Sequence, residues 1–508
     1  MTRTYSTRFV GFLFLAVCLA SPATHLVVAQ QTRGPYEDVR ELPEGAVGEV
    51  ITRLIETINA NDAERVKTFF DEHVADEFRA IAPMEQHIQV ARQLYEQTRG
   101  LEFYAVRKYE QATPEDEVVV IVRNKLTEGW QALVINVQPE PPHLMTSLGI
   151  SPARPPSDLP EMSKLTQDEI VQQLEAFVDR LAEADAFSGT VLLAKDGKVL
   201  FEAAHGLASK RFDVPVRIDT KFNLGSMNKM FTCVAITQLV QLGKLSLDDQ
   251  LSHFVGDDWL PQVVADKIQI KHLLTHTSGL GSYFNDTYQE SSKALFRELD
   301  DYRPLVADST LSFEPGSDWQ YSNTGMFLLG VVIEKVSGQN YFDYIRQHIH
   351  EPAGMPNSDC YDMDRPVANL AIGYSKGDGQ WQNNLYMHVI RGGPAGGGFS
   401  TVGDLLNFDR ALRGHQLLDA EHTELVWSAK PDMKSPSYGF GFAIHGTPDD
   451  RIVGHSGGFS GINSNLDMFL DSGFTAVVMS NYSGGAMPIV EKIRELIRHR
   501  RPDADASE

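Results

Sequence analysis

The sequence predicts an α/β (α+β) protein: a small α+β domain, then a larger domain in which terminal helices flank an antiparallel sheet. Three observations lead to this prediction. The chain has 508 residues, of which 42% are hydrophobic, enough for more than one core. A proline-rich stretch at 151–164 separates two regions of regular apolar periodicity. In the second region, helical patterns at both ends enclose strand patterns and a long middle stretch, which we expect to form a helical subdomain.

The N-terminus has the pattern of a secretory signal peptide over residues 1–29. Arg3 and Arg8 precede an apolar run at 9–20, and small residues follow it. The run is too short for a stable membrane span, although an uncleaved anchor stays open as an alternative. Lipidation of Cys18 ranks below cleavage, because the residues before it match a lipobox only loosely. We therefore expect export to the periplasm or the extracellular space.

The first predicted domain covers residues 44–150 and combines helices with strands. Apolar residues recur at helical spacing from Val47 to Ile58, Asn61 and Glu64 offer a capping box for a second helix, and a third helix covers 84–97. Segments rich in β-branched and aromatic residues then predict strands at 101–109, 117–126, 130–137 and 143–150.

This order of three helices and four strands resembles the cone-shaped fold of SnoaL-like and nuclear-transport-factor-like domains. Some relatives with that fold use pocket carboxylates, but we can assign no such constellation here. The resemblance implies an accessory role, with homo-oligomerisation through this domain as an alternative.

The second predicted domain covers 165–503 and follows the stiff linker at 151–164, which contains four prolines. Thr166 and Glu169 predict a capped helix with one apolar face. A hairpin follows, in which Asp196-Gly197 supplies the positive φ angles of a two-residue turn between strands at 190–195 and 198–202. Near the other end, strands at 465–470 and 474–479 pair around Ser472-Gly473, before a last helix that carries Val490, Ile493 and Ile497.

A candidate nucleophile stands at the start of a helix in the second domain. Ser226 and Lys229 are three residues apart at the head of an apolar helix that ends near Gly243. Residues at this spacing share a helix face, so the lysine amine can reach the serine hydroxyl, and burial can depress its pKa. The spacing alone is weak evidence, because such pairs also occur by chance.

Two further sequence elements strengthen the evidence that Ser226 is a nucleophile. Tyr321-Ser322-Asn323 precedes a helix from about 325 to 336, where Asn323 could equally be only an N-cap. His455-Ser456-Gly457 precedes a glycine-rich stretch and a strand, and by itself indicates only a loop.

In the order Ser-x-x-Lys, Tyr-x-Asn, His-x-Gly, these elements resemble the serine β-lactamase-related superfamily, which includes class C β-lactamases, DD-peptidases and family VIII esterases. The resemblance covers about 166–500 and includes four further segments, at 274–280, 313–316, 351–355 and 397–401.

The resemblance implies a role for each motif residue. Ser226 is the acylated nucleophile, Lys229 its base, and Tyr321 a partner that relays the proton to the leaving group. Asn323, His455 and Gly457 contact the substrate. The backbone N–H groups of Ser226 and Gly458 form the oxyanion hole.

The third motif departs from the β-lactamase pattern, in which lysine usually stands at the position of His455. Because His455 is mostly neutral near pH 7, we expect weaker binding of a β-lactam carboxylate. A small ester, amide or peptide is therefore the expected substrate, with β-lactamase or D-alanyl-D-alanine carboxypeptidase activity as the alternative. An inactive binding or wall-associated protein is the alternative from another class.

Several other patterns have simpler explanations. Ser456 sits in a Gly-x-Ser-x-Gly match, but a strand follows it where a nucleophile elbow requires a helix. His272 and His276 lack the glutamate of a metalloprotease motif, and we interpret them as structural. The glycines at 396–398 shape a turn, and Cys233 belongs to the core.

The sequence also limits the partners. The formal net charge of −23 argues against nucleic acid and against anionic membrane surfaces, since both bind basic patches. We expect neither a cofactor nor a metal.

Overall fold

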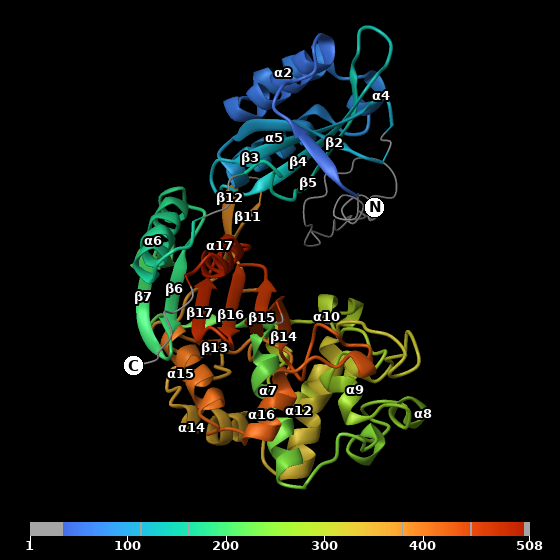
Figure 1. Cartoon of the computed structure of the whole chain (residues 1–508). Helices are drawn as coiled ribbons and strands as arrows, with labels where there is room; N and C mark the ends of the chain where they lie inside the picture. Colours follow the sequence, from blue (N-terminus) through green and yellow to red (C-terminus); the bar gives the residue numbers. More distant parts are fainter. Residues whose placement is uncertain (1–33, 112–113, 160–162, 378, 448–449, 502–508) are drawn as a thin grey trace. The chain divides into compact units, whose positions relative to one another are not determined.

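The computed structural model describes residues 34–501, except 112–113, 160–162, 378 and 448–449 (Figure 1). The chain divides into two compact units, Met1–Ser163 and Lys164–Glu508, and each is described by itself. The predicted signal peptide and Cys18 lie outside the described residues. Within the described part, none of the helices has both the length and the hydropathy needed to cross a membrane.

The first unit consists of helices followed by an antiparallel sheet. The three predicted helices and four predicted strands occur in the predicted order, with most bounds within two residues, and the structure adds a strand before them and a short helix between the second and third. The sheet has the order β1-β2-β3-β4-β5, and its core combines apolar residues of the strands with those of the helices, among them Ile51, Leu54 and Val120. The elements are β1 (Tyr36–Val39), α2 (Ala46–Ala60), α3 (Ala63–His73), α4 (Asp76–Arg79), α5 (Met84–Thr98), β2 (Leu101–Tyr109), β3 (Glu117–Asn124), β4 (Trp130–Val137) and β5 (Met145–Pro152).

One predicted cap in this unit is wrong. Asp62, not Asn61, is the N-cap of α3, and its carboxylate accepts a hydrogen bond from the Arg65 N–H. Asn61 instead ends α2 in the left-handed conformation with φ 50°. Both residues are good caps, but the preceding helix occupies Asn61 and leaves the next position to begin α3.

The first unit also extends beyond 44–150 at both ends. Strand β1 adds to the sheet, and β5 continues to Pro152, so 151–164 is not a free linker over its whole length. Asp38 of β1 forms an ion pair with Arg107 at 2.8 Å, and both side chains are buried. Arg107 also donates to the Arg154 carbonyl, and the Tyr36 hydroxyl donates to the Pro155 carbonyl. These bonds fasten the beginning of the predicted linker onto the sheet.

The second unit contains the predicted antiparallel sheet and terminal helices. The strand order is β14-β15-β16-β17-β6-β7, and the first and last helices, α6 and α17, pack together. Leu165 extends this contact by pairing its backbone with His499 and Arg501. The elements are α6 (Gln167–Glu183), β6 (Gly189–Lys195), β7 (Lys198–His205), β14 (Ala443–Thr447), β15 (Asp450–Phe459), β16 (Ile462–Phe469), β17 (Phe474–Ser480) and α17 (Met487–Arg498).

Local signals in this unit are confirmed by the geometry. The Thr166–Glu169 capping box begins α6. The turn between β6 and β7 has φ 48° at Asp196 and 71° at Gly197, and Gly473 has φ 73° in the turn before β17. These positive angles need residues that tolerate the left-handed region, which the turn sequences provide.

The middle of the second unit is the predicted helical subdomain. Its central helices α7 (Asn228–Gln241) and α12 (Asn323–Ser337) pack against each other (Figure 1). Nearly all of α7 is buried, so its side chains have no water-facing stripe. The other elements are β8 (Leu207–Ser209), β9 (Val214–Pro215), β10 (Phe222–Asn223), α8 (Gln262–Ala265), α9 (Ile270–Leu274), α10 (Asp286–Glu290), α11 (Arg303–Val306), α13 (Tyr341–Ile345), α14 (Glu351–Ala353), β11 (Tyr374–Gly377), β12 (Gln380–Asn383), β13 (Phe399–Ser400), α15 (Val402–Arg413) and α16 (Ala420–Trp427).

Candidate active site

Ser226 lies on a tight turn that leads into α7. A 3₁₀ turn, Gly225–Met227, connects strand β10 to the helix. Gly225 has φ 52°, and its N–H donates to the Asn223 side-chain oxygen at 2.8 Å. The neighbours of Ser226 in this turn are buried, whereas Ser226 itself is half-buried. The turn thus fixes the hydroxyl at the head of the helix while leaving it accessible.

Lys229 lies directly beside this hydroxyl. Its Nζ atom is 3.0 Å from Ser226 Oγ and also donates to the Ala395 carbonyl. The lysine side chain is fully buried, and this burial lowers its pKa to about 7. An amine with that pKa is partly neutral at neutral pH, so it can accept the serine proton.

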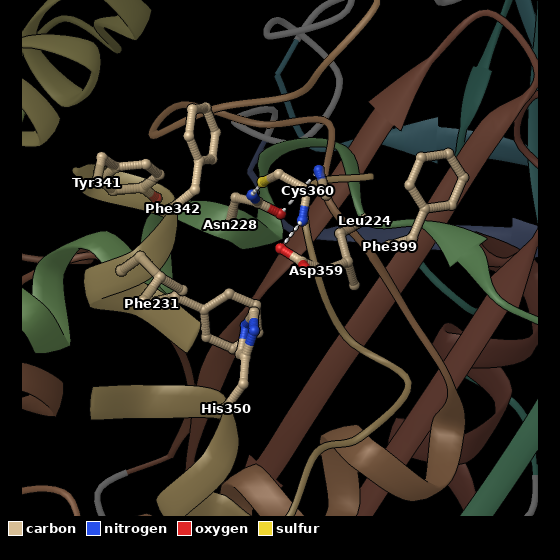
Figure 2. A pocket seen from close by; sticks show the side chains of 11 residues that line it. Leu224, Asn228, Phe231, Tyr341, Phe342, His350, Asp359, Cys360 and Phe399 are labelled. Carbon is tan, nitrogen blue, oxygen red and sulfur yellow. Dashed lines mark hydrogen bonds between the residues drawn. The ribbon is translucent and has the colours of Figure 1, made fainter. Parts of the chain in front are cut away.

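Asn228 holds the segment that carries Ala395. Its side-chain oxygen accepts the Gly398 N–H at 3.1 Å, and its nitrogen donates to the Gly393 carbonyl at 3.2 Å. The same nitrogen contacts Cys360 Sγ at 3.3 Å (Figure 2). A small pocket adjoins Asn228, lined largely by rings such as Phe231 and Phe342. Its lining does not include Ser226, so we assign it to packing behind the site.

Tyr321 is the third group at this point. Its phenol lies close enough to the Ser226 side chain to be affected by it, but burial is the larger effect and raises the phenol pKa to about 12. The Lys229 Nζ lies 4.9 Å from the centroid of the tyrosine ring. Ser226, Lys229 and Tyr321 therefore converge, with the lysine able to accept a proton and the phenol able to donate one.

His276 supports the tyrosine from behind. Its ring centroid is 4.4 Å from that of Tyr321 and 4.6 Å from that of Tyr438. His276 Nδ1 accepts the Ser322 N–H at 3.1 Å, and burial lowers its pKa well below the usual value. His272 Nδ1 likewise accepts the Gln269 N–H at 3.1 Å. Both histidines thus accept a backbone N–H group, which fits their interpretation as structural residues.

The His455-Ser456-Gly457 motif is part of a strand, so the reading of it as a loop is wrong. It lies inside β15, where His455 pairs with Leu466 and Gly457 with Ser464 of β16. The ladder forms despite the glycines because β16 supplies partners along the whole segment. Ser456 points to solvent from this strand and does not begin a helix.

His455 is buried and neutral. Burial lowers its pKa to about 3, with nearby Lys229 as a second cause. The expectation that it carries little charge near pH 7 is confirmed. Its Nε2 atom lies 3.0 Å from the Tyr438 hydroxyl. The Nε2 atom of the imidazole therefore already has a hydrogen-bond partner within the protein.

Strand β15 lies directly against the turn of Ser226. A side chain on Gly457 would place Cβ only 1.8 Å from the Leu224 carbonyl oxygen. A Cβ built on Gly225 would lie 2.9 Å from the backbone nitrogen of Gly458. The absence of side chains at Gly225 and Gly457 allows this approach, and it brings the Gly458 N–H close to the residue before Ser226.

Asn323 is the first residue of α12 and not its cap. Ser322 caps the helix, accepting the Gly325 N–H at 2.8 Å. The Asn323 amide is consequently free of the capping role and donates to Ser282 Oγ at 3.2 Å.

Sequence reasoning missed Asn228, Ala395 and Tyr438, although each contacts the lysine, its acceptor segment or His455. Asn228 is one of the two residues between Ser226 and Lys229, so its polarity within an apolar helix was an available signal. Ala395 acts through its backbone carbonyl, and Tyr438 is an isolated tyrosine, so neither offered one.

Other chemistries find little support. The described residues contain no group of three or more His, Cys, Asp or Glu side chains that could hold a metal ion. Cys233 is buried, and its burial raises the thiol pKa far above the range of a nucleophile, as expected for a core residue.

Comparison with known proteins decides the family. A family model described as Beta-lactamase matches residues 172–498. The chain belongs to the beta-lactamase family. It is a serine hydrolase of the type that includes penicillin-binding proteins, esterases and D-aminopeptidases.

Three relatives illustrate the range of this beta-lactamase family. Penicillin-binding protein 4* of Bacillus subtilis (strain 168) is 31% identical over 327 residues, which is 61% of this chain and 71% of that protein. Esterase EstB of Burkholderia gladioli is 27% identical over 396 residues, 67% of this chain and 98% of the esterase. The crystal structure of a penicillin binding protein from Bacillus halodurans has a TM-score of 0.57 and 31% identity, covering 66% of this chain and 99% of that one.

Proposed function

We propose that this protein is an exported hydrolase that forms an acyl-enzyme at Ser226 with small esters, amides or peptides. The observation that carries the proposal is the 3.0 Å contact between Lys229 Nζ and Ser226 Oγ, made by a buried amine whose pKa is about 7. Such an amine is a competent base for a serine hydroxyl, which by itself is a weak nucleophile.

The proposed reaction gives each nearby group a defined role. Neutral Lys229 takes the Ser226 proton as Oγ attacks the substrate carbonyl, and the N–H groups of Ser226 and Gly458 receive the oxyanion. Tyr321 passes a proton from Lys229 to the leaving oxygen or nitrogen as the bond breaks. Water then attacks the acyl-enzyme ester by the reverse transfers, and Asn323 holds another carbonyl of the substrate.

The environment of His455 favours substrates without a carboxylate beside the scissile bond. The imidazole is neutral and lies 3.0 Å from the Tyr438 hydroxyl, so it supplies no cation to a β-lactam or a peptide terminus. β-Lactamase or D-alanyl-D-alanine carboxypeptidase activity is the second candidate. The 31% identity to a protein named penicillin-binding protein 4* favours it.

Export and assembly complete the proposal. Arg3, Arg8 and the apolar run at 9–20 support a signal peptide over 1–29 and hence a periplasmic or extracellular location. Homo-oligomerisation through the first unit stays a prediction.

Covalent labelling tests the function. Wild-type protein should gain the mass of one fluorophosphonate adduct, and Ser226→Ala should gain none. Ser456→Ala is the matched control, because Ser456 is exposed on a strand; this variant should label normally. Labelling of the Ser226→Ala protein at another serine would contradict the assignment. An unlabelled wild-type protein would support the alternative of an inactive binding protein.

A further inference from the structure

Two aromatic side chains meet beside the proposed substrate-binding groups. Phe284 stands two residues after Ser282, the hydrogen-bond acceptor of Asn323. Phe459 directly follows Gly458. The two rings stack with their centroids 6.3 Å apart and an interplanar angle of 26°. The stacked rings therefore connect the segment that binds Asn323 with the strand that carries Gly458.

Backbone hydrogen bonds fix Phe284 relative to Asn323. The Ser322 hydroxyl donates to the Gly281 carbonyl at 3.0 Å, and the Thr324 N–H donates to the same oxygen at 3.3 Å. The segment at 281–284 thus runs along the Tyr-x-Asn motif. The position of the Phe284 ring follows from this attachment.

Phe459 shares the strand face that packs on the Ser226 turn. Side chains alternate along β15, so Phe459 lies on the same face as Gly457, which contacts the Leu224 carbonyl. The His388 ring lies 5.8 Å from that of Phe459. Burial lowers the pKa of His388 to about 4, so near pH 7 this ring is uncharged and extends the aromatic surface.

Part of this surface is exposed, whereas Phe459 and His388 are half-buried. Phe284 is 38% exposed, and in the loop that carries His388, Leu385 is 41% and Met387 45% exposed. Exposed apolar groups gain free energy when a ligand covers them, so the exposed Phe284 ring stacked on Phe459 can contribute to ligand binding. The stacked pair itself offers ring faces and edges, which suit another flat ring.

We propose that Phe284 and Phe459 form a subsite for an aromatic acyl group, such as phenylacetyl, on the ester hydrolysed at this site. The assignment rests on the proposed acylation of Ser226. The ring pair belongs to the acyl side because it adjoins Gly458, proposed to receive the oxyanion of the acyl carbonyl, and Asn323, proposed to hold a further carbonyl of the substrate. Tyr321, which serves the leaving group, packs instead against His276, and the His276 ring also lies 5.8 Å from that of Trp319.

Two esters with one leaving group isolate this subsite. The ratio of kcat/KM for p-nitrophenyl phenylacetate to that for p-nitrophenyl acetate should be about ten in the wild type. Phe284→Ala and Phe459→Leu should each lower this ratio about five- to tenfold while acetate turnover continues. Phe212→Ala is the matched control, since Phe212 is 69% exposed on the turn between β8 and β9; it should leave the ratio unchanged.

The outcomes separate the subsite from the function. An unchanged ratio in both variants, with intact acetate turnover, would overturn the subsite and leave the acylation of Ser226 standing. A change confined to 1-naphthyl acetate relative to p-nitrophenyl acetate would assign the rings to the leaving group and also overturn it. Failure of the wild type to turn over either ester or to be labelled would refute the proposed function. Thermal melting of Phe459→Leu identifies misfolding, in which case Phe284→Ala decides.

Discussion

At the scale of single residues, the chemistry depends on a lysine whose charge the protein disfavours. Lys229 is fully buried in helix α7, and its side chain contacts a hydroxyl, a carbonyl and an aromatic ring. Each of these accepts or tolerates an amine, but the burial itself penalises the ammonium form. Burial of Lys229 therefore costs stability, but it also keeps part of the amine neutral near pH 7, and the neutral amine can act as the base.

The pH dependence of acylation should report this lysine. Protonated Lys229 cannot accept the Ser226 proton, so activity is present above its pKa of about 7 and is lost as the pH falls through that value. We expect kcat/KM for p-nitrophenyl acetate to fall about tenfold per pH unit below about pH 6. Lys229→Ala should slow acylation by several orders of magnitude. A flat wild-type profile between pH 5 and 8 would exclude Lys229 as the base.

Asn228 should act as a positioning residue for Lys229. Asn228→Ala removes two hydrogen bonds to the segment that presents the Ala395 carbonyl, so we expect labelling to slow about ten- to a hundredfold. Asn228→Asp places a negative charge next to the lysine and should move the rising limb of the pH profile upward. Asn407→Ala is the control, because Asn407 also donates to a backbone carbonyl, that of Gly354, but from α15. Equal effects of Asn228→Ala and Asn407→Ala would contradict this role.

Replacement of His455 by lysine should change substrate choice. A fixed ammonium near a bound carboxylate is worth about 1.5–3 kcal/mol, so the ratio of nitrocefin to p-nitrophenyl butyrate efficiency should rise about ten- to a hundredfold in His455→Lys. Because His455 and Lys229 interact electrostatically, the new charge should also lower the pKa of Lys229. If activity in His455→Lys rises at a lower pH than in the wild type but the nitrocefin to p-nitrophenyl butyrate ratio is unchanged, the new ammonium is present but does not set the substrate preference.

At the scale of elements, most helices and strands could be predicted because their signals are local. The Thr166–Glu169 box and the Asp196-Gly197 turn depend on neighbours within a few residues, and both are confirmed. Strand β1 has only four residues and forms by pairing with β2, about 70 residues away, so its own sequence gave no period to detect. The same limit applies to β15, whose glycines look like a loop until β16 supplies the ladder.

The contacts of the candidate site also divide into local ones, which the sequence predicts, and long-range ones, which it does not. The spacing of Ser226 and Lys229 predicts their contact because one helix turn brings them together. The contact of Lys229 with Ala395 spans 166 residues of sequence, and that of His455 with Tyr438 joins β15 to a segment outside the named strands. Such contacts arise from tertiary packing and leave no local signature.

The approach of β15 to the serine turn should tolerate no side chain at Gly457. In Gly457→Ala the new methyl group would overlap the Leu224 carbonyl, so the strand must move and labelling should slow at least about a hundredfold with a lower melting temperature. Gly458→Ala is the matched variant, because nothing lies within 4 Å of the added Cβ; it should melt like the wild type. Normal labelling of Gly457→Ala would show that the close approach is dispensable.

At the scale of the whole molecule, each unit has its own core and its own closing contacts. In the first unit, the Arg107–Asp38 ion pair joins β1 to the sheet, and bonds from the same region hold residues 154–158. In the second unit, Leu165 pairs with His499 and Arg501 and thereby joins the two chain ends of the unit. The boundary between Ser163 and Lys164 leaves both sets of contacts complete.

A truncated chain beginning at Ser163 should therefore fold and react like the full protein. It keeps Leu165, the Thr166 cap and the packing of α6 on α17, so its labelling rate and p-nitrophenyl acetate turnover should match the wild type. A chain beginning at Gln167 is the control: it lacks the Leu165 pairing and the cap, and loss of the cap alone costs about 1 kcal/mol, so it should melt at a lower temperature. Sedimentation of the full-length protein and of the Ser163 chain tests assembly, because oligomers formed through the first unit should be lost on truncation. An insoluble or inactive Ser163 chain beside an active full-length protein would show that the first unit completes the second, since the catalytic groups themselves all lie beyond residue 164.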